Sequence, residues 1–74
     1  METIRTFTAF DVLDSNLNIT LELIKCNDHY EVRETYKSDN KSKKDQYTIT
    51  RKFAFYSMAK YDYENSLYVI QEYA

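Results

Sequence analysis

The chain has 74 residues and a formal net charge of −2, with no glycine or proline, one histidine and one cysteine. Glycine-rich phosphate loops and multi-cysteine or multi-histidine metal sites are therefore excluded. Because 43% of the residues are hydrophobic and no apolar run approaches the ~20 residues of a membrane span, we expect one soluble domain over residues 1–74. A single cysteine forms no internal disulfide, which favours a cytoplasmic protein.

The first element, Thr3–Leu13, carries two competing patterns. Its threonines and phenylalanines favour a strand, whereas the spacing of Ile4, Phe7, Phe10 and Leu13 also suits a short helix. We predict a strand here and keep the helix as the alternative.

A β-hairpin is predicted at the centre of the chain. Apolar and polar residues alternate over Leu17–Cys26 and again over His29–Lys37, as they do in half-buried strands. Asn27 and Asp28 separate the two runs, and both residue types tolerate the positive φ of two-residue hairpin turns. The turn predicts the cross-strand pairs Cys26–His29, Leu23–Val32, Ile19–Tyr36, Glu22–Arg33 and Thr20–Thr35, all of which are chemically compatible.

A polar loop, Ser38–Asp45, separates the hairpin from a third run that starts at about Gln46. In this run Tyr47, Ile49 and Phe53 alternate with polar residues, which predicts another strand. The segment Phe53–Lys60 suits either an extended strand or the first turns of a helix, so the end of the strand stays open.

A C-terminal helix is predicted from Tyr61, with Asp62 as its N-cap and Glu64 in its positive first turn. Its apolar side consists of Tyr63, Ser66, Leu67, Ile70 and Ala74. The predicted fold class is therefore α+β, an antiparallel sheet of three to four strands with one C-terminal helix packed on one face. This architecture hosts many functions and by itself supports none.

Catalytic and metal-binding functions find little support in the residue types. Cys26 and His29 flank the predicted turn, but the chain has no other cysteine or histidine to complete a zinc site. Glu31 and Glu34 should face opposite sides of their strand, and no carboxylate pair falls in a predicted pocket. We therefore expect no catalytic residue, no metal and no cofactor, and a protein that is not an enzyme.

The charges are unevenly distributed along the chain. Residues 37–52 carry six basic and two acidic residues, whereas residues 61–74 carry three acidic and no basic ones. A basic loop beside aromatic residues suits contact with a nucleic-acid backbone. Nucleic-acid binding is thus the alternative function, with the candidate residues Lys41, Lys43, Lys44, Arg51 and Lys52.

Tyrosine is the most unusual component, with eight in 74 residues, more than so small a core should absorb. The side of the predicted helix opposite its apolar stripe carries Tyr61, Glu64, Asn65, Tyr68 and Glu72. Tyrosine is enriched at protein interfaces, and acidic neighbours favour a basic partner. We therefore expect a protein–protein interaction module that binds a basic partner protein without entering a membrane.

The biological setting is predicted only as a class. The lysine, asparagine, isoleucine and tyrosine bias without glycine or proline suggests an AT-rich bacterial or phage genome. Some small phage and mobile-element proteins inhibit host proteins through acidic, aromatic surfaces, so an inhibitor of a host protein is one form of this expectation. A second copy of the chain, giving a homodimer, is another partner.

Overall fold

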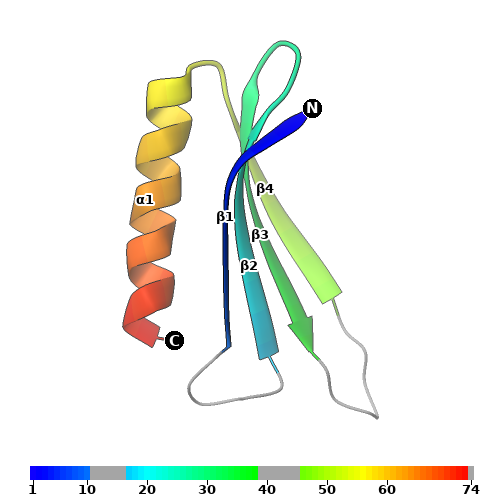
Figure 1. Ribbon diagram of the computed structural model, residues 1–74, viewed down its shortest axis with the longest axis vertical. Coiled ribbons are helices and arrows are strands. Elements are labelled where there is room, and N and C mark those ends of the chain that lie inside the picture. Colours follow the sequence, from blue (N-terminus) through cyan, green and yellow to red (C-terminus); the bar gives the residue numbers. More distant parts are fainter. Residues whose placement is uncertain (11–16, 39–45, 74) are drawn as a thin grey trace.

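The protein folds as a four-stranded antiparallel sheet with one helix packed on one face (Figure 1). The computed structural model describes residues 1–10, 17–38 and 46–73. The strands lie in the sheet in chain order, and the α+β arrangement predicted from the sequence is confirmed. The elements are β1 (Glu2–Phe10), β2 (Leu17–Lys25), β3 (Tyr30–Ser38), β4 (Gln46–Phe53) and α1 (Tyr56–Tyr73).

The central hairpin has the predicted register. All five expected residue pairs are present in or next to the β2–β3 ladder, and the Cys26 N–H donates to the His29 carbonyl at 2.9 Å. The predicted positive φ of the turn is wrong, because no residue in the described part of the chain has a positive φ. Asn27 and Asp28 therefore close the hairpin without a positive φ.

The remaining boundaries resolve the two ambiguous segments. The first segment is a strand, β1, which ends at Phe10, and residues 11–13 of the prediction lie outside the described residues. The strand β4 ends at Phe53 and the helix begins at Tyr56, so most of the segment left open, Phe53–Lys60, forms the first turns of the helix. In the described chain, no helix has the length and apolar character needed to cross a lipid bilayer.

The early start of α1 overturns two assignments. Asp62 is not an N-cap, because it lies in the second turn of the helix, and Glu64 is not in the first turn. Asp62 instead accepts a hydrogen bond from Arg51 on β4 at 2.8 Å. The side chain of Asp62, which was predicted to cap the helix, therefore connects the helix to the sheet.

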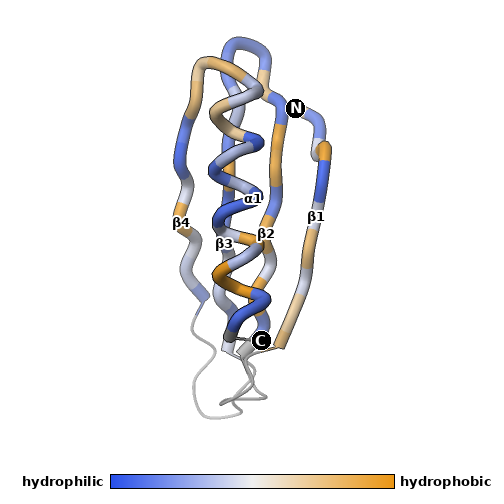
Figure 2. The backbone as a smooth tube through the Cα atoms, turned by 90° about the vertical axis from the view of Figure 1, so that its left-hand side faces the viewer, coloured by the Kyte–Doolittle hydropathy of each residue, from blue (hydrophilic) through white to orange (hydrophobic). Residues whose placement is uncertain are grey.

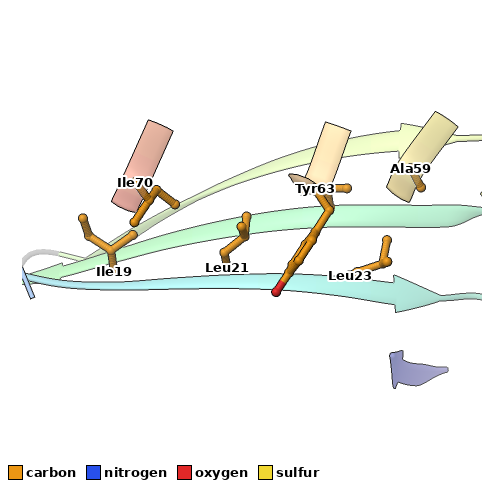
Figure 3. Close-up of a cluster of buried hydrophobic side chains, with 7 residues drawn as sticks. Ile19, Leu21, Leu23, Ala59, Tyr63 and Ile70 are labelled. Carbon is orange, nitrogen blue, oxygen red and sulfur yellow. The ribbon is translucent and has the colours of Figure 1, made fainter. Parts of the chain in front are cut away.

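The core lies between α1 and the middle of the sheet (Figure 3). Leu21, Leu23 and Val32 on the two central strands are fully buried, and the helix covers them with Ala59 and Tyr63. Figure 2, which views the molecule from the helix side, shows α1 running along β2 and β3. Period-two alternation therefore directs one face of each central strand into the core and the other away from the helix.

A half-buried arginine joins three elements beside this core. The guanidinium of Arg51 donates to Glu34 on β3 at 2.5 Å, and to Asp62 and Ser66 on α1 at 2.8 Å each. Its three donor nitrogens each contact a different acceptor, which suits the planar, forked guanidinium and not a lysine. The contact positions α1 relative to the β3–β4 edge of the sheet.

Replacing Leu21 tests the core. The Leu21→Ala variant should lower the free energy of unfolding by about 2–5 kcal/mol, because it leaves a cavity where the side chain is fully buried. Urea denaturation measures the change. Val69→Ala, which removes methyl groups from an exposed helix position, is the control and should shift stability by less than about 1 kcal/mol. Equal losses in the two variants would contradict the assigned core.

Replacing Arg51 tests the contact between helix and sheet. The Arg51→Ala variant leaves Glu34 and Asp62 without their shared cation and should lose about 2 kcal/mol. This is less than a fully buried pair would lose, because the guanidinium is still one-third exposed to water. Lys52→Ala, which removes an exposed cation from the next position, should be nearly neutral in the same denaturation experiment. A neutral Arg51→Ala variant would show that the contact does not stabilise the fold.

Candidate functional site

The outer face of α1 carries the tyrosines that the sequence assigned to a partner. Tyr61 and Tyr68 are 70% and 65% exposed, and Glu64, Asn65 and Glu72 are exposed beside them. Tyr63, two residues after Tyr61, points into the core, because each residue of a helix is rotated by about 100° from the one before it. The structure thus brings the five predicted residues together on one solvent-facing side, which we call the outer helix face.

Two further apolar residues extend this face. Met58 and Val69 are 55% and 53% exposed, and both lie on or beside the line through Tyr61 and Tyr68. A helix that packs only on its own sheet normally has a polar outer side. The helix α1 instead carries large apolar groups on both sides, so one of its faces has no partner within the described chain. The sequence analysis missed Met58 because it began the helix at Tyr61.

The spacing of the outer helix face resembles that of a helix–helix seam. Met58, Tyr61, Asn65, Tyr68 and Glu72 follow one another at steps of three and four residues. Such spacing keeps side chains in line along a helix that packs against another helix. A polar residue in the middle of the seam, here Asn65, is a known means of fixing register.

The charges on this face are acidic and only weakly compensated. Glu64 lies 3.9 Å from Arg5 and from Lys60, and all three side chains are about half exposed. Exposed pairs at this distance contribute little energy. Glu72 takes part in none of the ion pairs found among the described residues. The face therefore keeps a negative potential next to its tyrosines.

The basic candidates for nucleic-acid binding do not form one patch in the described residues. Arg51 faces the helix and is held by its three acceptors, whereas Lys52, the next residue on β4, points to the other side of the sheet. Lys41, Lys43 and Lys44 lie outside the described residues. Arg51 was a candidate for nucleic-acid binding because of the local positive charge alone, without regard to the face of β4 on which it lies.

A second cluster of chemically active side chains lies at the end of the β2–β3 hairpin. The ring of His29 lies between two carboxylates, with Nδ1 2.5 Å from Asp28 and Nε2 2.7 Å from Glu31. Arg33 donates from Nε to the other oxygen of Glu31 at 2.9 Å. The side chain of Cys26 adjoins Glu31 and His29, so a thiol, an imidazole and a carboxylate converge at one point.

The pKa values in this cluster reflect its mutual contacts. Hydrogen bonds from His29 and Arg33 lower the pKa of Glu31 to about 2, so this buried carboxylate is ionised. Hydrogen bonds with Asp28 and Glu31 raise the pKa of His29. Burial and the neighbouring Glu31 raise the pKa of Cys26, because both disfavour a thiolate. The sequence analysis named Cys26 and His29 but missed the contribution of Glu31.

Comparison with known proteins adds no relative: no family model, curated protein or solved structure matches the chain.

Proposed function

We propose that this protein is a non-enzymatic interaction module that binds a partner protein through the outer helix face. The observation that carries the proposal is the exposure of Tyr61 and Tyr68 on a helix whose opposite side already fills the core. Tyrosine provides a large contact area at low entropic cost and is enriched among residues that dominate binding energy. Large exposed apolar groups gathered on one face are typical of interaction sites.

The expected partner is basic and presents a helix. Glu64 and Glu72 flank the tyrosines, so a partner with lysine or arginine at the rim would be attracted and correctly oriented. The three–four spacing from Met58 to Glu72 suits a second helix laid along α1. Inhibition of a host protein by a small phage or bacterial protein is one setting in which such a surface would act.

Two alternatives have less support. Nucleic-acid binding through residues 37–52 would lack a contribution from Arg51, because its guanidinium already donates hydrogen bonds to two carboxylates and a hydroxyl group. Homodimerisation through α1 would place acidic faces against each other, while β1 and β4 each leave one strand edge open to a second copy. Light scattering at two concentrations separates a homodimer from a module for another protein.

The proposal is tested by capture from a lysate of the source organism or its host. Wild-type bait is compared with the Tyr61→Ala, Tyr68→Ala double variant, and a captured protein is then purified for affinity measurement. Loss of both rings should weaken binding at least about tenfold, because each is expected to be a dominant contact. The melting temperature should stay unchanged, since neither ring packs in the core.

A matched control removes two exposed aromatic rings elsewhere. Phe10 and Tyr47 are 61% and 58% exposed on the sheet, away from the outer helix face. The Phe10→Ala, Tyr47→Ala double variant should keep the wild-type affinity. Equal binding by wild type and the helix variant, or retention of nucleic acid alone, would overturn the proposal.

A further inference from the structure

The geometry points to a zinc-type divalent metal site formed by Cys26, His29 and Glu31 at the end of the β2–β3 hairpin. One ligand atom from each residue, the thiol sulfur, an imidazole nitrogen and a carboxylate oxygen, lies within 4.8 Å of the other two. These are the three side-chain types that bind Zn²⁺ in proteins. Three protein ligands leave a fourth tetrahedral position for water or another small ligand.

The backbone register brings these residues together. Cys26 lies opposite His29 across the turn, and their main chains are joined by the 2.9 Å hydrogen bond that closes the hairpin. Glu31 follows His29 by two residues on β3, so it points to the same face, and it pairs with Ile24 on β2. Cys26 and His29 lie directly beyond the ends of β2 and β3, so the convergence follows from the strand register and from the hydrogen bond that closes the turn.

The imidazole and the carboxylate require only a small adjustment to hold the ion, and the sulfur, which lies within 4.8 Å of both, would move toward them. Tetrahedral zinc with bond lengths of ~2.0–2.3 Å places a nitrogen and an oxygen ligand about 3.3 Å apart, and a sulfur and a nitrogen about 3.6 Å apart. His29 Nε2 and Glu31 Oε2 are now 2.7 Å apart, joined by a hydrogen bond. The ion would take the place of that proton, and the two atoms would separate by about 0.6 Å, within reach of side-chain rotation.

Neighbouring residues already orient two of the three ligands. Asp28 contacts His29 Nδ1 at 2.5 Å, which leaves Nε2 as the metal-binding nitrogen. Carboxylates hydrogen-bonded in this way to a ligand histidine are a recurring feature of zinc sites. Arg33 holds Glu31 Oε1, so Oε2, which is now hydrogen-bonded to His29 Nε2, is the oxygen that would face the ion.

The charges also match a divalent cation. A thiolate and a carboxylate would supply two negative charges to the ion, while Arg33 pairs with the second oxygen of Glu31 and Asp28 pairs with His29. Glu31 is the one charged side chain buried below one-tenth exposure in the described chain, at 6%. A hollow lined by Met1, Glu2, Lys25, Cys26 and Asn27 lies beside Cys26.

The test titrates metal-free protein with Zn²⁺ and follows heat release and melting temperature. Wild type should bind one ion per chain and melt at a higher temperature with the ion bound, since the ligand stabilises the folded state. Co²⁺, used as a spectroscopic probe, should give the thiolate-to-cobalt charge-transfer band that reports the Cys26 bond.

Three variants distinguish binding of Zn²⁺ at the proposed site from unspecific binding of Zn²⁺ to the protein surface. Cys26→Ser should lose the cobalt band and weaken Zn²⁺ binding at least about tenfold, and Asp28→Asn should weaken it about tenfold. Cys26→Ser decides the question, because it keeps every ion pair of the cluster and should therefore keep the fold. Glu22→Gln, which changes a carboxylate one row away on the same sheet face, is the matched control and should bind as wild type.

The proposal is overturned by any of three results. They are no saturable Zn²⁺ uptake by wild type, a stoichiometry below one ion per chain, or equal affinity of wild type and Cys26→Ser. The experiment uses no partner protein, so its outcome is independent of the outer helix face.

Discussion

The pairing of β2 with β3 is the constraint on which the rest of the structure depends. Its register places Leu21, Leu23 and Val32 on the helix side of the two central strands, where they form the middle of the core. A slip by one residue would turn these side chains away from α1 and expose them. The same register sets Cys26 opposite His29 and directs Glu31 to the other face. One ladder therefore determines both the core and the cluster at the hairpin end.

The small size of the domain explains why α1 is apolar on both sides. A chain of this length buries a smaller part of its surface than a larger domain does, and one helix can cover only one sheet face. The inner side of α1 uses Ala59, Tyr63 and Ile70 to cover the central strands. Met58 and Tyr68 find no contact of that kind and remain exposed. Binding a partner would remove this surface from water, which would stabilise both the complex and the fold.

The sequence was sufficient for the strands because their patterns are local. Alternation over β2 and β3 and the compatibility of facing residues predicted the hairpin register correctly, and alternation also placed Glu34 and Glu31 on opposite faces. These inferences need only the period of a strand and the reach of a short turn. The positive φ assigned to the turn failed because Asn27 and Asp28 permit that conformation without requiring it.

The helix start and the role of Arg51 depend on contacts that local patterns do not encode. Around the start of α1 apolar residues lie on both sides of the helix, so the period of 3.6 is masked before Tyr61. Asp62 carries the signal of an N-cap, and its actual partner on β4 is eleven residues away in sequence. Only the packing of helix on sheet shows that the acid and the arginine meet.

The candidate sites differ in the same way. The outer helix face was predictable because one helical period sorts exposed from buried residues, and Tyr61 and Tyr68 lie where that period puts them. The cluster at the hairpin end was only partly predictable from the sequence, which identified two of its members, Cys26 and His29. Glu31 was also within reach, because the predicted register already placed it on their face. Glu31 was missed because only cysteine and histidine were considered as further ligands beside Cys26 and His29.

The two sites lie on different sides of the sheet, which allows them to act together through stability and not through contact. The outer helix face belongs to the layer that covers the inner side of β2 and β3, while Glu31 and His29 lie at the end of their other side. A metal ion at the hairpin end would clamp Cys26 to Glu31 across the two central strands. Opening of the hairpin would then cost the binding energy of the ion, and the core beneath α1 would be protected by the same amount.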